Sequence, residues 1–254
     1  ADLPVVCPVH PSGGYLSGGG EYVYVGSYGV REHKNDLARQ LDACSEVLKR
    51  VKRGGFVNVH SGVDAWTTEE AVDFLAFASA AAGKCDFDVC FETHRQRLFG
   101  SPFSTRELLS DDRVSTLTHL RLNADLSHWF VSCERVFDQA EARDAGWWPE
   151  LLGKIASRCD YVHCRFGFAQ GPQIADPSAE EYEKEVNLQL RNWMTLWKAQ
   201  VARGKEECWC SPELGPQPYM PSMPHTQKDV ADLANSVHWT KERIQETFQQ
   251  EVVQ

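Results

Sequence analysis

The stretch DVCFETHR, residues 88–95, joins an apolar run directly to a group of ionisable side chains. Val89, Cys90 and Phe91 have the composition of a buried strand, and Glu92 and His94 follow with no turn signal between them. Such an abrupt change is typical of a strand whose carboxyl end opens into an active site, as in α/β barrels. The alternative is that the charged residues end the strand only because they reach solvent.

The same pattern recurs along the chain. Four other short β-type runs end in polar residues, namely FVNVH (56–60), LRLNAD (120–125), YVHCR (161–165) and CWCSPE (208–213). A helical pattern follows each run, and strands that alternate with helices at this spacing predict parallel βαβ units.

Helix signals lie between these runs. Apolar residues at helical spacing predict an amphipathic helix from Asp36 to Val51, and the longest helix is expected over residues 179–203. The S/T-x-x-acid pattern caps helix starts, and it occurs at Thr67 with Glu70, Ser104 with Glu107, Ser178 with Glu181 and Thr226 with Asp229. Pro149 suits a first helical turn, and Gly83 and Gly204 suit helix ends.

Parallel βαβ units form either an open doubly wound sheet or a closed (β/α)8 barrel. The sequence contains no GxGxxG or GxxxxGK[ST] phosphate loop, which would mark a nucleotide-binding open sheet, and the ionisable strand ends favour the barrel. A chain of 254 residues that is 42% hydrophobic is long enough for one such barrel. We therefore expect a single domain over residues 1–254.

Composition excludes several classes of protein. No apolar run of about 18 residues is present, and the first residues lack the basic end and apolar stretch of a secretory signal. The nine cysteines contain no CxxC pair and resemble buried thiols of a reducing compartment. The net charge of −10 disfavours a nucleic-acid surface. We expect a soluble intracellular protein, in the cytoplasm or an organelle lumen, that binds neither membrane nor nucleic acid.

Side chains at the carboxyl ends of barrel strands converge on one face. The residues that this arrangement would bring together are His60, Glu92, His94, Asp125, His128, His163, Arg165 and Glu213. Carboxylates combined with imidazoles suit a divalent cation, either Mn²⁺, Mg²⁺, Co²⁺ or Zn²⁺. The sequence therefore predicts a metal site at the strand ends.

Five ordered segments resemble the sugar phosphate isomerase/epimerase family of the xylose isomerase-like TIM barrels. They are NVHSGVDAW (58–66), FETHRQRLFGSP (91–102), LNADLSHW (122–129), HCRFGFAQGPQIADP (163–177) and PELGPQPYMPSMPHT (212–226). The resemblance implies a (β/α)8 barrel and a metal set of Glu92, Asp125, His163 and Glu213. It also implies that His128 and Arg165 contact the substrate, although Arg165 lies closer to His163 than in the epimerases.

Other residues near the strand ends are candidates for substrate contact. His60 either binds substrate or orients a ligand, and His94 either binds substrate or braces Glu92. Trp66 could form an apolar wall for a sugar ring or belong to the core. Gln170 lies on a loop where substrate contact and solvation are both open.

The amino-terminal part departs from the family pattern. Counting back from Glu213, EYVYV (21–25) becomes about the third strand, so the first one or two barrel strands are missing or irregular. LPVVCPVH (3–10) offers a weak strand, but Pro4 and Pro8 argue against a central position. We expect either that residues 1–20 form an irregular segment that closes the barrel, or that a partner covers the gap, in a homo-oligomer or another complex.

The resemblance implies a metal-dependent isomerase or epimerase of a small sugar or hydroxy-carbonyl compound, acting by proton transfer through an enediolate. Glu92 and Glu213 would then be the catalytic base and acid. Two alternatives stay open. One is a metal-dependent hydrolase, with His60, His94 and His128 as extra ligands, and the other is a non-catalytic barrel that serves as a binding or assembly subunit.

Overall fold

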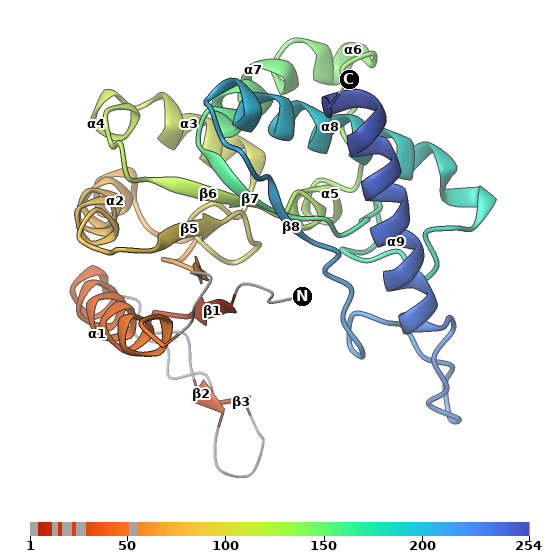
Figure 1. Ribbon diagram of the computed structural model, residues 1–254, viewed down its shortest axis with the longest axis horizontal. Helices are drawn as coiled ribbons and strands as arrows, with labels where there is room; N and C mark the ends of the chain where they lie inside the picture. Colours follow the sequence, from red (N-terminus) through yellow and green to blue (C-terminus); the bar gives the residue numbers. More distant parts are fainter. Residues whose placement is uncertain (1–4, 12–14, 17–21, 24–28, 51–54, 254) are drawn as a thin grey trace. The chain divides into compact units, whose positions relative to one another are not determined.

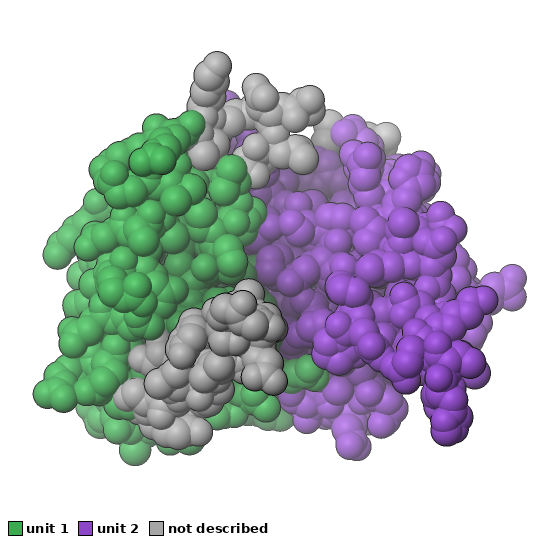
Figure 2. Space-filling model, turned by 90° about the horizontal axis from the view of Figure 1, so that it is seen from below, with its two compact units in different colours: residues 1–123 green, residues 124–254 purple. Residues whose placement is uncertain are grey.

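The computed structural model describes residues 5–11, 15–16, 22–23, 29–50 and 55–253. The chain divides into two compact units, Ala1–Asn123 and Ala124–Gln254, which Figure 2 shows in different colours. Each unit is described by itself below. The expectation of one domain over residues 1–254 stays a prediction.

Parallel strands form the centre of the first unit. They are β1 (Val5–Val9), β4 (Gly55–Val59), β5 (Asp88–Glu92) and β6 (Arg121–Ala124), whose last residue begins the second unit. β4 pairs with both β1 and β5, and β5 pairs with β6, all in parallel. Val57 and Phe91 are completely buried, as expected for central strands that are covered on both faces. The strands predicted from FVNVH, VCFE and LRLNAD are therefore confirmed.

β1 was predicted only as a weak strand because of its prolines. The structure places Pro8 inside β1, opposite Asn58 of β4, and β1 stands at the end of the sheet order. An edge strand needs to pair along one side only, so the missing N–H of a proline costs no ladder hydrogen bond there. Pro8 therefore excludes a central position for this strand but not a position at the edge. Pro4 lies outside the described residues.

The prediction that EYVYV forms a strand of the barrel is wrong for its described residues. β3 (Tyr22–Val23) pairs antiparallel with β2 (Tyr15–Leu16), in a sheet separate from the parallel one. Residues 21, 24 and 25 lie outside the described residues. The alternating Tyr and Val side chains suit a short hairpin as well as a barrel strand, so composition alone did not separate the two.

Helices α1 (Val30–Leu48) and α2 (Thr68–Ala82) lie side by side in the first unit (Figure 1), and α1 also contacts β1 and β4. Leu37 and Leu41 of α1 are buried, which confirms the amphipathic pattern. Thr67 and Glu70 form the expected capping box at the start of α2. Two short helices, α3 (Pro102–Ser110) and α4 (Asp112–Ser115), follow β5.

The second unit combines two parallel strands with longer helices. The strands are β7 (Cys159–His163) and β8 (Trp209–Ser211), which pair in parallel. The helices are α5 (Ser127–Ser132), α6 (Ala142–Ala145), α7 (Trp148–Ala156), α8 (Glu183–Ala202) and α9 (Leu233–Phe248), with a 3₁₀ turn at Glu180–Tyr182 and a π-helical turn at Gln249–Val253. α8 contacts α7, α9 and β7 (Figure 1).

Buried tryptophans build the core of the second unit. Trp148, Trp193 and Trp197 are each 1% exposed, and Trp148 Nε1 donates a hydrogen bond of 3.3 Å to Asn192 of α8. A buried indole N–H needs such a partner to offset the cost of leaving water. α8 is therefore held to α7 by apolar packing and by a hydrogen bond.

Three of the four predicted helix starts were wrong. α3 begins earlier than expected, because Ser101 is its N-cap and Pro102 occupies its first turn. Ser178 hydrogen-bonds Asp176 in a loop instead of capping α8, and α9 is capped by Asp232 rather than by Thr226. Pro149 does lie in the first turn of α7, and Gly204 follows α8 with a φ of +84°. Short polar patterns also form loop turns, so they identify a helix only when tertiary packing supports it.

In the first unit the described parallel strands are ordered β1-β4-β5-β6, and in the second unit β7 pairs in parallel with β8. The protein therefore has an α/β fold whose six parallel strands alternate with helices, which is compatible with part of a TIM barrel. The closed eight-stranded barrel and its xylose isomerase-like type stay predictions. In the part of the chain that the structure describes, none of the helices combines the length and hydropathy that crossing a membrane requires.

Candidate metal centre

A cluster of two carboxylates and an imidazole lies within the second unit. Asp125 follows β6, His163 ends β7 and Glu213 follows β8. Each offers a ligand atom within 4.8 Å of those of the others, and Nδ1 of His163 is 2.7 Å from Oε2 of Glu213. Consecutive strand ends thus bring together three of the four residues predicted as metal ligands.

Asp125 is held rigidly. Its side chain is fully buried, and its Oδ1 accepts hydrogen bonds from the backbone N–H of Ser127 at 3.0 Å and from the Ser127 hydroxyl at 2.5 Å. Ser127 opens α5, so the helix start fixes the carboxylate. Nε2 of His128, also fully buried, is 3.5 Å from Oδ2 of Asp125. The residue predicted to bind substrate therefore also contacts the predicted ligand.

Arg165 balances the negative charge of this cluster. Its Nη2 is 3.4 Å from Oδ2 of Asp125 and forms a short ion pair with Glu213. Its guanidinium lies 4.3 Å from the ring centre of Tyr219, in cation–π geometry. Burial alone would lower the pKa of Arg165, but the two carboxylates raise it above its usual value. Arg165 therefore stays charged although its side chain is only 4% exposed.

Gln173 positions the loop that carries Glu213. Its Oε1 accepts a hydrogen bond of 2.8 Å from the N–H of Gly215, and its Nε2 donates one of 3.0 Å to the Gly215 carbonyl. Gln173 is 3% exposed. The amino-acid sequence does not reveal this role, because a glutamine on a loop has no pattern that identifies its partner.

A second cluster lies within the first unit, at the ends of β4 and β5. His60, Glu92 and His94 each offer a ligand atom within 4.8 Å of the others, and Nε2 of His60 is 2.7 Å from Oε2 of Glu92. Asn58 of β4 donates a short hydrogen bond to Glu92 and accepts one of 3.1 Å from Asn123. Asn58 was missed from the sequence, where it looked like an ordinary strand residue.

His10 also belongs to this region, although it was not predicted as a site residue. Its ring centre is 4.3 Å from that of His60, and the ring centres of His60 and His94 are 4.7 Å apart. Burial is the main reason why the pKa of His10 and that of His94 are each lowered to about 4. Both imidazoles are therefore neutral at pH 7.

Trp66 and Gln170, the two other residues predicted to contact substrate, lie in different surroundings. Trp66 is half-buried, and its ring packs against His33 of α1 and Phe74 of α2, with ring centres 4.8 and 5.3 Å away. Gln170 is exposed, in the turn where Phe168 and Gly171 form a bridge. Their predicted contact with substrate stays a prediction.

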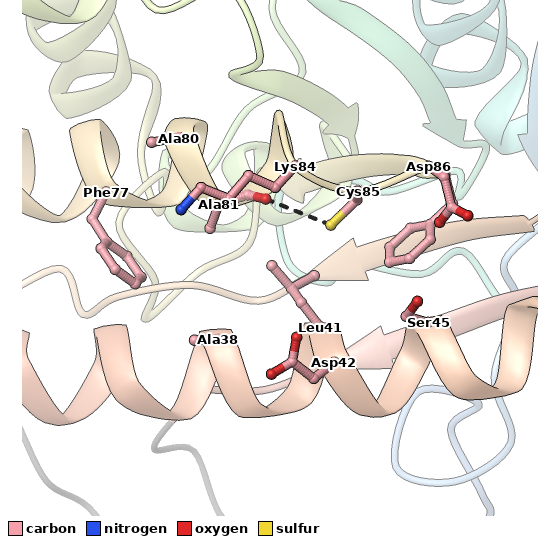
Figure 3. A pocket seen from close by; sticks show the side chains of 11 residues that line it. Ala38, Leu41, Asp42, Ser45, Phe77, Ala80, Ala81, Lys84, Cys85 and Asp86 are labelled. Atoms are coloured by element: carbon pink, nitrogen blue, oxygen red, sulfur yellow. Dashed lines mark hydrogen bonds between the residues drawn. The ribbon is translucent and has the colours of Figure 1, made fainter.

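A cavity of about 340 Å³ lies between α1 and α2 of the first unit (Figure 3). Leu41 of α1 and Phe77 of α2 line it, and Cys85 donates a hydrogen bond of 3.5 Å to the carbonyl of Ala81. None of the predicted site residues lines this cavity.

The cluster in the second unit fits a divalent cation. Ligand atoms lie about 2.0–2.2 Å from zinc or a similar ion, so two ligands on opposite sides are about 4 Å apart. Donors within 4.8 Å of one another need only small adjustments to share an ion. Glu92, the fourth predicted ligand, belongs to the first unit, and its share in this site stays a prediction.

Comparisons with known proteins add no further assignment. No protein-family model, no curated protein and no solved structure matches this chain. The family resemblance therefore depends on the five sequence segments alone.

Proposed function

We propose that the protein is a divalent-metal-dependent isomerase or epimerase of a small sugar or hydroxy-carbonyl compound. The observation that carries this proposal is the meeting of Asp125, His163 and Glu213, which are far apart in the sequence, within 4.8 Å. Three donors that converge from three strand ends are typical of a site built at the carboxyl ends of parallel strands.

The donor set indicates the kind of chemistry. A divalent ion held by these residues would act as a Lewis acid toward the carbonyl of a substrate, which makes the neighbouring C–H more acidic. Carboxylates hold such an ion together with an imidazole, as Asp125 and His163 would here. By the family resemblance, Glu92 is the fourth ligand.

Glu213 is the group best suited to move a proton. Its side chain is 37% exposed, whereas that of Asp125 is fully buried, so Glu213 can reach both solvent and substrate. Arg165 and His128 would bind the hydroxyl groups of the substrate, and the resemblance assigns Glu92 as the partner acid or base on the other face. The proton would pass through an enediolate form of the substrate.

Deuterium exchange tests this proposal. The protein, loaded with Mn²⁺, is incubated in D₂O with a panel of ketoses, and deuterium at the carbons next to the carbonyl is measured by NMR. We expect exchange with at least one ketose, reduced about 10²-fold or more in Glu213→Gln, because general acid–base catalysis contributes about this factor. Glu180→Gln, which changes an exposed glutamate, should exchange like the wild type.

Two outcomes would favour the alternatives. Release of phosphate from model phosphoesters without any deuterium exchange would favour the hydrolase, for which the His60, Glu92 and His94 cluster supplies extra ligands. Less than stoichiometric metal after purification in Mn²⁺ would favour a non-catalytic binding or assembly subunit.

A further inference from the structure

The histidine-rich cluster of the first unit has the features of a metal site of its own. Its donors are His60, which follows β4, Glu92, which ends β5, and His94, which follows β5, so the ends of two paired strands supply them. The isomerase proposal uses His60 and His94 only for substrate contact. The contacts around these residues indicate a different role.

The imidazole of His94 is oriented for metal binding. Its Nδ1 lies 2.6 Å from the backbone carbonyl of Arg95, to which it donates its proton. This hydrogen bond leaves Nε2 with the lone pair. In metal sites a histidine typically uses one ring nitrogen as ligand while the other donates to a carbonyl or carboxylate.

Glu92 is oriented as well. Asn123 donates to Oδ1 of Asn58, which directs the Asn58 amide nitrogen toward Oε2 of Glu92 and to within 3.4 Å of Nε2 of His60. Two asparagines therefore hold the carboxylate and the imidazole together. A ligand set supported by such hydrogen bonds is bound more tightly than one that must be ordered on binding.

His10 borders the cluster on the side of β1. Its ring centre is 4.3 Å from that of His60, and its Nδ1 is buried and has no hydrogen-bond partner within the described residues. A buried nitrogen without a partner is costly, so this side of the cluster is suited to a further polar or charged group.

We propose that His60, Glu92 and His94 bind a Zn²⁺ ion. Two imidazoles and one carboxylate form a ligand set of the kind that zinc prefers, whereas Mg²⁺ and Ca²⁺ prefer oxygen ligands alone. The proposed function depends on the donors Asp125, His163 and Glu213, none of which belongs to this ligand set. Glu92 occurs in both donor sets, so variants of Glu92 do not separate the two sites.

Zinc stoichiometry tests this inference without any assay of activity. The full chain is stripped with a chelator, titrated with Zn²⁺, and desalted, and the zinc content is measured by mass spectrometry. We expect about two ions per chain in the wild type and about one in His94→Gln, in His60→Gln and in Asp125→Asn, because each change removes a ligand of one site only. The double variant His94→Gln/Asp125→Asn should bind none.

Controls make the result specific. His238→Gln changes an exposed histidine of α9 and should keep the zinc content of the wild type. Circular dichroism shows whether each variant is folded, and His60→Gln is the second variant because His60 is less buried than Glu92. A His94→Gln variant that is folded and binds as much zinc as the wild type, with the same affinity, would overturn the inference.

The same measurement separates failure of this inference from failure of the proposed function. A single ion that is lost in Asp125→Asn but kept in both histidine variants would overturn the histidine site and leave the isomerase centre intact. A single ion that is lost in both histidine variants but kept in Asp125→Asn would support the histidine site and contradict the isomerase centre.

Discussion

Arg165 is the residue on which the charge balance of the second unit's cluster depends. Its guanidinium contacts both Asp125 and Glu213, and the Asp125 carboxylate is fully buried. A buried carboxylate is stable only beside a compensating charge. A divalent cation bound nearby would also supply positive charge, so Arg165 and the metal would both compensate the negative charge of Asp125 and Glu213.

Replacing Arg165 by methionine should therefore destabilise the metal-free protein strongly. We expect Arg165→Met to lower the free energy of unfolding by about 3–5 kcal/mol, because it leaves buried negative charge uncompensated. Saturating Mn²⁺ should restore part of the loss. Urea denaturation with Mn²⁺ and with EDTA measures both effects, and Arg191→Met, at an exposed position of α8, is the control. Equal stability of Arg165→Met and the wild type in EDTA would contradict this account.

The buried thiol of Cys159 provides a second prediction at the residue scale. Burial raises its pKa to about 12, above a value of about 8.5 in an unfolded chain. Because the folded-state pKa is the higher one, its contribution to stability is complete below about pH 8.5 and is lost as the pH rises toward 12.

The free energy of unfolding of the wild type, relative to that of Cys159→Ala, should thus fall by about 2 kcal/mol between pH 8 and pH 10. Denaturation of both proteins at the two pH values measures this difference. Burial also raises the pKa of the half-buried Cys133, but by less, so the corresponding change with pH relative to Cys133→Ala should be smaller. A difference between wild type and Cys159→Ala that does not change with pH would show that the thiolate is not disfavoured by folding.

At the scale of secondary-structure elements, the site depends on how β8 continues into the following loop. β8 is short, from Trp209 to Ser211, so the strand itself ends before Glu213. The double hydrogen bond between Gln173 and Gly215 fixes the loop instead. Gln173, a loop residue far away in the sequence, thus determines where Glu213 lies.

Gln173→Ala should weaken metal binding more than it weakens the fold. We expect a loss of about 10-fold or more in Mn²⁺ affinity, as for other residues that support a metal ligand, and a loss of about 1–3 kcal/mol in stability. Calorimetric titration gives the affinity, and Gln139→Ala, at an exposed glutamine, is the matched variant. If both variants bind Mn²⁺ like the wild type, Gln173 does not position Glu213.

At the scale of the whole molecule, metal binding and folding should be coupled. A ligand that binds only the folded state stabilises it by about 2.7 kcal/mol at a free concentration 100 times its dissociation constant. We expect Mn²⁺ to raise the unfolding free energy of the wild type by about this amount and EDTA to reverse it. The increase in unfolding free energy should be much smaller in Asp125→Asn. An equal increase in both proteins would mean that the ion does not bind at Asp125.

Much of the α/β architecture could be predicted from local sequence. The strands β4, β5, β6, β7 and β8 were predicted from short apolar runs that end in polar residues, and α1 from its apolar spacing. These patterns depend on residues that are close in the sequence, so they can be recognised without knowledge of the tertiary structure. The prediction for Tyr22–Val23 was wrong because the pairing partner, which no local pattern reveals, places these residues in an antiparallel pair with Tyr15–Leu16.

The amino-acid sequence by itself determined which residues stand at strand ends, and hence the types of donor atom available to a metal. Only the tertiary structure decided their partners: Asn58 for Glu92, Arg165 for Asp125 and Glu213, and Gln173 for Gly215. A local pattern reflects the period of a strand or helix, whereas a hydrogen bond or ion pair joins atoms whose separation along the chain carries no periodic signal.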